Sequence, residues 1–167
     1  HYLDELKKLA EVSTEYIKKL PSYHGIILVK NNEGRVNLNR LVSASHLEYF
    51  NRRPRMPKSL IQKYREGLII GSACEAGEVY QAVVREKEEA ELARIVQFYD
   101  YLEIQPIDNN SFMISSDKYA AQTVEDLQDY NKRIVTLGES YNKPVVATCD
   151  VHFLDPEDEI YRRIIMA

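Results

Sequence analysis

Four short runs of β-branched and other apolar residues divide the chain into blocks. The runs are Ile26–Val29, Leu68–Ile70, Tyr101–Ile104 and Val145–Thr148. Each run is almost continuously hydrophobic, which is typical of a strand that is covered on both faces. We therefore predict four buried β-strands at these positions.

Helical periodicity fills much of the sequence between the runs. Apolar residues follow the i, i+3, i+4, i+7 spacing of an amphipathic helix at Leu92, Ile95, Val96 and Tyr99. A longer stretch from Val124 to Leu137 does the same, and Thr123 can cap it together with Asp126. Another amphipathic helix is expected from Leu6 to Leu20, and residues 106–116 read as a polar loop. Helices that alternate with buried strands indicate an α/β fold with βαβ crossovers and mostly parallel strands.

Composition and charge narrow the classes of function. The 167 residues suffice for one domain or a large part of one, and a net charge of −4 gives no overall attraction for nucleic acid. The two cysteines are too few for a disulfide framework and suit reduced cytosolic thiols. No apolar run is long enough to cross a bilayer, so we expect a cytoplasmic chain with no membrane partner. The sequence does not begin with Met, and we treat it as a piece of a longer protein.

Chemically active residues follow two of the four predicted strands. In parallel α/β folds, functional residues collect just after the carboxyl ends of the strands. Cys74 follows the second run, and Asp150 and His152 follow the fourth. The third run leads to no strong ligand, and His24 precedes the first run instead of following it. A site is therefore expected where the second and fourth strands end.

Asp150 and His152 are the strongest candidates for a metal site. They are two residues apart, so in an extended segment both side chains point to the same side. A carboxylate oxygen and an imidazole nitrogen that converge in this way suit Zn²⁺, Mn²⁺ or Fe. The alternative is a pair that caps a helix N-terminus, because Asp155–Asp158 begins the last predicted helix.

Cys74 and His24 are less clear from spacing alone. A thiolate at a strand end near a helix N-terminus would be favoured by the helix dipole, which suits a soft metal ligand. His24 opens a strand, and its position favours a satisfied or exposed histidine over a ligand. His46, inside a helical pattern, is also a weak candidate.

A local basic patch lies next to two aromatic residues. Arg52, Arg53 and Arg55 follow Tyr49 and Phe50, a combination that can contact a phosphate backbone. The alternative, a solvated loop, is the more usual explanation of such a run.

Several motifs occur together in an order that resembles a known family. They are Tyr23–Asn31, Tyr49–Arg55, Glu66–Cys74, Tyr101–Gln105 and Pro144–His152. Together they closely resemble the PHP (polymerase and histidinol phosphatase) domain of bacterial replicative DNA polymerase III α subunits. The forms of Arg52–Arg55 and Ser72–Glu78 resemble the PolC class in particular.

The resemblance implies a fold and a set of metal ligands. Members of this family have a distorted barrel of seven β/α units, with a metal cluster at the carboxyl ends of the strands. His24, Cys74, Asp150 and His152 fall on ligand positions of the family, which reverses the interpretation of His24. The family's opening His-x-His, its Asp/His pair and its Glu ligand have no counterpart here, so the site in this chain is expected to be incomplete.

The same resemblance implies how the chain belongs to a larger enzyme. In the PolC class an exonuclease is inserted into the PHP domain, so residues 1–20 are expected to be a helix from that junction and residues 21–167 the later part of the domain. The parent would be a DNA-directed DNA polymerase with 3′–5′ exonuclease, and this piece alone would be inactive. Its expected partners are the rest of the α subunit (the N-terminal PHP part, the exonuclease and the polymerase core) and DNA.

The sequence leaves two other functions open and predicts one assembly state. A free-standing metal-dependent phosphoesterase of the PHP type would need the His-x-His that the sequence lacks. A structural or interaction module without metal is the other alternative. Because a cut sheet leaves unpaired edges, we also expect that the chain forms a homodimer.

Overall fold

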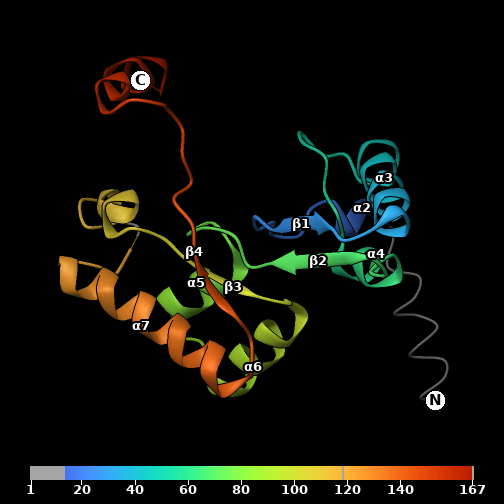
Figure 1. Cartoon of the computed structure of the whole chain (residues 1–167), viewed down its shortest axis with the longest axis horizontal. Helices are drawn as coiled ribbons and strands as arrows, with labels where there is room; N and C mark the ends of the chain where they lie inside the picture. Colours follow the sequence, from blue (N-terminus) through green and yellow to red (C-terminus); the bar gives the residue numbers. More distant parts are fainter. Residues whose placement is uncertain (1–13, 118, 167) are drawn as a thin grey trace. The chain divides into compact units, whose positions relative to one another are not determined.

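The computed structural model describes residues 14–117 and 119–166 (Figure 1). The chain divides into two compact units, His1–Gly71 and Ser72–Ala167. Strands β1 (Ile26–Val29) and β2 (Leu68–Gly71) belong to the first unit, and β3 (Leu102–Ile104) and β4 (Val145–Ala147) to the second. The predicted positions of all four strands are therefore confirmed.

In the first unit, β1 and β2 pair in antiparallel fashion, with Ile26 opposite Gly71. The prediction of parallel strands is wrong for this pair, because the residues at the end of β1 lie beside those at the start of β2. Lys30 N, just after β1, donates a 2.9 Å hydrogen bond to the carbonyl oxygen of Gly67, just before β2. The helices α3 (Asn32–Leu47) and α4 (Lys58–Lys63) lie between the two strands in the sequence, and α3 packs on both.

Helix α3 is fixed to this sheet by polar as well as apolar residues. Asn31 caps it by accepting a 2.9 Å hydrogen bond from Gly34 N, and Asn37 Nδ2 donates to the Glu66 carbonyl oxygen at 2.9 Å. Its buried positions are Gly34, Asn37, Leu41 and Ser45, which share one helical face. Because only one of these four is a large apolar residue, hydrophobic spacing gives little sign of this helix. The remaining described helix of the unit is α2 (Thr14–Ile17), and the earlier part of the helix predicted from Leu6 lies outside the described residues.

In the second unit, β3 and β4 pair in parallel, with Leu102 opposite Val145. Helix α7 (Val124–Ser140) connects them and packs on both strands, which confirms the predicted βαβ crossover (Figure 1). The segment predicted as a polar loop instead forms a 3-10 helix, η1 (Ile107–Met113), because its buried Met113 packs into the core beneath α7.

The core of the second unit lies among α5 (Glu78–Val84), α6 (Glu89–Phe98), α7 and β3. The helix predicted from the spacing of Leu92, Ile95, Val96 and Tyr99 is confirmed as α6, and all four side chains are buried. Helix α7 contributes Leu127, Ile134 and Leu137 to the same core.

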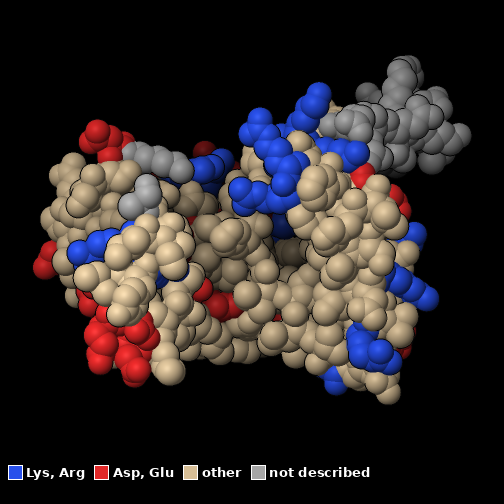
Figure 2. Space-filling view, turned by 90° about the horizontal axis from the view of Figure 1, so that it is seen from above, with Lys and Arg blue, Asp and Glu red and all other residues tan. Residues whose placement is uncertain are grey.

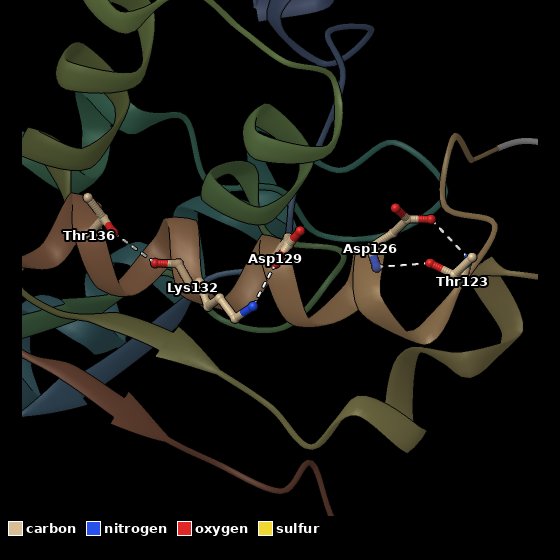
Figure 3. Close-up of polar contacts among 5 residues, drawn as sticks. All are labelled: Thr123, Asp126, Asp129, Lys132 and Thr136. Atoms are coloured by element: carbon tan, nitrogen blue, oxygen red, sulfur yellow. Dashed lines mark hydrogen bonds and ion pairs between the residues drawn. The ribbon is translucent and has the colours of Figure 1, made fainter.

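The predicted cap of α7 is also confirmed (Figure 3). Asp126 N donates to Thr123 Oγ1 at 3.2 Å, while the Asp126 carboxylate accepts from the backbone N–H groups of Thr123 and Gln122 at 2.9 and 2.8 Å. These bonds satisfy amides that a helix N-terminus otherwise leaves unpaired. Farther along, Lys132 Nζ lies 2.8 Å from Asp129 Oδ1 on the exposed face.

The prediction that every strand is buried holds only for β2 and β3. In β1, Ile26 and Leu28 are 37% and 47% exposed, and in β4 Val146 is 38% exposed. The described strands form two separate two-stranded sheets and no closed barrel, within a mixed α/β arrangement. The apolar sequence of β1 and β4 is that of covered strands, but the contacts of α3 with β1 and of α7 with β4 leave these side chains partly exposed.

The carboxyl end of the described chain is a 3-10 turn, η2 (Pro156–Asp158), followed by α8 (Glu159–Met166). Asp155 caps this turn through a capping box with Asp158. Several apolar residues of α8 are exposed, among them Ile160, Ile164 and Ile165. Within the described part of the chain, no helix combines the length and the apolar character that a membrane span requires.

Candidate metal centre

Cys74 lies in a tight turn between β2 and α5. Gly77 N donates a 2.8 Å hydrogen bond to the Cys74 carbonyl oxygen, and a Cβ atom at Gly77 would overlap the carbonyl oxygen of Ser72. Ala73, just before the cysteine, has a φ of 59°, in the left-handed region that non-glycine residues seldom adopt. The turn therefore holds the half-buried Cys74 side chain in a fixed position just beyond β2.

The electrostatic surroundings of Cys74 oppose a thiolate, contrary to the expectation from the helix dipole. Burial raises the pKa of its thiol from 9.0 to about 11, and the nearby Glu75 and Asp150 carboxylates add to the rise. The helix that was expected to favour the anion, α5, begins only at Glu78 and is seven residues long. A bound cation would act in the opposite direction, because it stabilises the thiolate directly.

Asp150 and His152 lie in an exposed segment after β4. Asp150 has a φ of 49°, so the segment turns instead of continuing as the extended strand that their spacing suggested. His152 Nδ1 lies 2.6 Å from the Asp150 carbonyl oxygen and 4.0 Å from its Oδ2. The alternative interpretation as a helix cap is wrong, because the capping residue is Asp155. The preceding residue, Cys149, is held through its carbonyl oxygen by Asn109 Nδ2 at 2.7 Å.

Three of the four predicted ligands belong to the second unit, and their chemistry suits a metal ion. Asp150 lies near enough to Cys74 to raise the pKa of its thiol, and it neighbours His152. Sulfur, carboxylate oxygen and imidazole nitrogen are the ligands that Zn²⁺ takes in proteins. His24 lies in the first unit, where it is exposed just before β1. Among residues 14–117 and 119–166, no three His, Cys, Asp or Glu side chains already converge as a metal-binding group.

One buried charged residue near these turns, Glu103, was not identified by the sequence analysis. Glu103, in the middle of β3, is buried, and its Oε2 accepts a 2.9 Å hydrogen bond from Thr148 Oγ1. Burial raises the pKa of the nearby Tyr101 phenol to about 12, and the Glu103 carboxylate contributes to this rise. A charged residue within the apolar run Tyr101–Ile104 was the signal that could have identified it.

The basic loop of the first unit is anchored by its own side chains. Asn51 Nδ2 donates to the Lys18 carbonyl oxygen at 2.8 Å, and Arg55 Nη1 donates to the Leu20 carbonyl oxygen at 2.7 Å. Arg52 and Arg53 are exposed. Figure 2 shows one larger group of basic side chains on the face it presents, with other basic side chains scattered over the same face. The three arginines therefore have different roles in the structure: Arg55 anchors the loop, whereas Arg52 and Arg53 are exposed on it.

Comparison with known proteins identifies the family. The PHP domain family matches residues 5–107, which include Cys74 and the strands β1, β2 and β3. The chain belongs to the PHP domain family. The family match ends before Asp150 and His152, but longer relatives extend the similarity across that segment.

These relatives are PolC-type DNA polymerases III. The protein of that name from Clostridium perfringens is 57% identical over 167 residues, covering 99% of this chain and 11% of the relative. The Bacillus subtilis protein is 43% identical over 166 residues, and the Staphylococcus epidermidis protein 39% over 167 residues, again 11% of each relative. The chain thus spans about a tenth of the length of the curated relatives it matches.

Proposed function

We propose that this chain is part of the PHP domain of a PolC-type DNA polymerase III, in which it supplies His24, Cys74, Asp150 and His152 to a divalent-metal centre. The observation that supports this most is similarity along its whole length to PolC-type polymerases, combined with the proximity of Cys74 to Asp150. Residues 1–20 would then come from the exonuclease junction and residues 21–167 from the PHP domain itself. The (β/α)7 barrel and the remaining ligands would be completed by segments of the parent polymerase.

The partners of the chain follow from this proposal. Its first partner is the rest of the polymerase, which would cover the exposed apolar residues of β1, such as Leu28, and of β4, such as Val146. The parent enzyme would synthesise DNA and proofread it, with the catalytic residues outside this chain. The piece alone would bind metal weakly and would catalyse neither reaction.

Titration with Co²⁺, a coloured substitute for Zn²⁺, tests the metal centre in the purified chain. A cysteine thiolate that binds Co²⁺ gives a charge-transfer absorption band, so the band reports which cysteine is the ligand. We expect Cys74→Ser to abolish the band and Cys149→Ser, the matched control next to Asp150, to retain it. Loss of the band in the control alone, or no band in the unmodified chain, would reject this ligand set.

The histidines allow a second matched comparison. His24→Gln should weaken Co²⁺ binding, whereas His46→Gln should not, because His46 lies on α3 and its Nδ1 contacts the Val42 carbonyl oxygen at 2.9 Å. Equal affinities in the two variants would remove His24 from the proposed ligands.

A structural module without metal is the second candidate, and one observation favours it. Within the described residues, the donors do not already converge as a group of three or more. Such a module would show no Co²⁺ band, and its thermal unfolding would be unchanged by Zn²⁺, Mn²⁺ or a chelator. Metal that binds the folded state alone would raise the unfolding temperature instead.

We also propose that Arg52 and Arg53 contact the phosphate backbone of DNA, with Arg55 holding their loop. Fluorescence anisotropy with a labelled oligonucleotide can test this. Changing both residues to alanine should weaken binding and reduce its dependence on salt by about one unit of slope for each phosphate that these arginines neutralise. The matched control changes Lys132 and Arg133, two exposed cations of α7, and should leave the slope unchanged.

The isolated chain is further proposed to form a homodimer through its uncovered strands. Light scattering over a range of concentrations should then show twice the mass of one chain. A lysine in place of Leu28, which is 47% exposed, should return the chain to a monomer without unfolding it. A monomer at every concentration would exclude the dimer.

A further inference from the structure

Glu103 is a carboxylate buried inside the second unit. Its side chain is only 6% exposed, and the preceding residue on β3, Leu102, is fully buried. A carboxylate is seldom buried unless its oxygens have partners, because removing the charge from water costs free energy. The contacts of Glu103 therefore indicate what this burial achieves.

These contacts connect the two turns that carry candidate ligands. Thr148 Oγ1 donates to Glu103 Oε2 at 2.9 Å, and Glu103 N donates to Ser72 Oγ at 2.9 Å. Ser72 is two residues before Cys74, and Thr148 is two residues before Asp150. A single residue of β3 thus joins the chain leading to the thiol with the chain leading to the carboxylate.

Backbone hydrogen bonds make the same connection on both sides of β3. Ser72 N donates to the Tyr101 carbonyl oxygen at 3.3 Å, and Thr148 N donates to the Ile104 carbonyl oxygen at 3.0 Å. Ser72 is itself 2% exposed. Both turns therefore leave the sheet from positions tied to β3, one on each side of Glu103.

The second carboxylate oxygen of Glu103, Oε1, takes no part in the hydrogen bonds that connect the two turns. Oε1 is buried and has no hydrogen-bond partner among the residues that the structure describes. The neighbouring Tyr101 hydroxyl also interacts with this carboxylate, which contributes to the raised pKa of the phenol. Carboxylates that orient ligands through hydrogen bonds are a regular feature around protein-bound metals.

We propose that Glu103 is a positioning residue of the metal centre, which sets the separation of Cys74 and Asp150 through Ser72 and Thr148. The proposal rests on the metal-binding function proposed above. Glu103 is not itself assigned as a ligand.

Co²⁺ titration of two Glu103 variants tests this role. Glu103→Ala removes the acceptor for Thr148 and should weaken Co²⁺ binding by about tenfold or more, as loss of an orienting residue commonly does. Glu103→Gln keeps an oxygen that can accept this bond and should restore most of the affinity. The matched control is Asn110→Ala, which removes a buried amide that donates to Tyr80 and should leave the affinity unchanged. Equal loss in both Glu103 variants, or none in Glu103→Ala, would overturn the proposal.

A measurement without metal separates failure of this proposal from failure of the metal centre. Thr148→Val removes the hydroxyl while keeping the shape of the side chain, and it should shift the backbone amide resonances of Ser72 and Cys74. Thr136→Ala, on the exposed face of α7, should not shift them. Shifts without a Co²⁺ band in the unmodified chain would uphold the connection and reject the metal centre. A band without shifts would uphold the metal centre and reject the connection.

Discussion

Gly34, in the first turn of α3, lies directly against the backbone of Gly67, the residue before β2. A Cβ atom at Gly34 would overlap the carbonyl oxygen of Gly67, whose own φ of 74° favours glycine. This contact joins the residues just after β1 to those just before β2. It therefore helps to determine that the two strands run antiparallel.

Gly34→Ala should destabilise the chain even though alanine favours helix. The added methyl group can be accommodated only by moving the backbone of Gly67, and overpacking of this kind costs about 1–3 kcal/mol. Gly25→Ala is the matched control, because a Cβ atom there would meet no atom within 4 Å. Urea denaturation should show the loss in the first variant only, and equal stabilities would contradict the close contact.

The cap of α7 gives a second prediction about stability. Thr123→Ala removes the hydroxyl that accepts from Asp126 N, and should lower the free energy of unfolding by about 1 kcal/mol. Thr136→Ala deletes a hydroxyl inside the same helix, where it donates to the Lys132 carbonyl oxygen, and should change stability by less than about 0.5 kcal/mol. Thermal unfolding followed by circular dichroism can compare the two variants.

The same cap should make stability depend on acid pH through Asp126. Hydrogen bonds from the backbone amides of Gln122 and Thr123 lower the pKa of its carboxyl group below 3.8. A lowered pKa contributes stability that is present above the unfolded-state pKa and is lost as the pH falls through the folded-state value.

Comparison with Asp126→Asn can test this dependence. The variant should be less stable than the unmodified chain at neutral pH, and the difference should shrink below a pH of about 3.8, where unfolded aspartates gain their proton. Asp129→Asn, which removes an exposed carboxylate outside the cap, is the control. A difference between Asp126→Asn and the unmodified chain that stays constant with pH would contradict the assigned hydrogen bonds.

Local patterns predicted the elements of this fold better than they predicted their arrangement. The cap at Thr123 and the spacing of Leu92 to Tyr99 depend only on neighbouring residues, and both are confirmed. The antiparallel pairing of β1 with β2 instead brings together residues far apart in the sequence, such as Gly34 and Gly67. Hydrophobic periodicity describes residues that are close together in the sequence, so it cannot predict such a contact.

The same limit applies to the candidate site. Apolar runs correctly placed Cys74 and Asp150 just beyond strands. The left-handed backbone conformation of Asp150, however, cannot be predicted from a pattern of hydrophobic residues. Hydropathy also cannot show whether an apolar strand is covered by its own chain, so Leu28 was expected to be buried and is half exposed. The role proposed for Glu103 depends on hydrogen bonds to residues from two other segments, which no single stretch of sequence reveals.

The reactivity of Cys74 gives a prediction at alkaline pH. In a Cys149→Ser background, only Cys74 can react with iodoacetamide, which attacks the thiolate and not the thiol. Since the pKa of Cys74 is raised to about 11, its alkylation rate should still be rising where an ordinary cysteine has reached its plateau. An alkylation profile with its midpoint near pH 9.0, the ordinary value, would contradict the burial of this thiol.

Two neighbouring carboxylates should affect this pKa unequally. Glu75 acts on Cys74 through both charge and a side-chain hydrogen bond, whereas Asp150 acts through charge alone and more weakly. Glu75→Gln should therefore lower the pKa of the thiol more than Asp150→Asn does. The reverse order would mean that Asp150 lies nearer to the sulfur than the structure places it.

Because the folded-state pKa of Cys74 is raised, its contribution to stability is present below the unfolded-state value of 9.0 and is lost as the pH rises towards about 11. Unfolding by denaturant at increasing pH should accordingly become easier across this range, and less so in Cys74→Ser, which lacks the buried thiol.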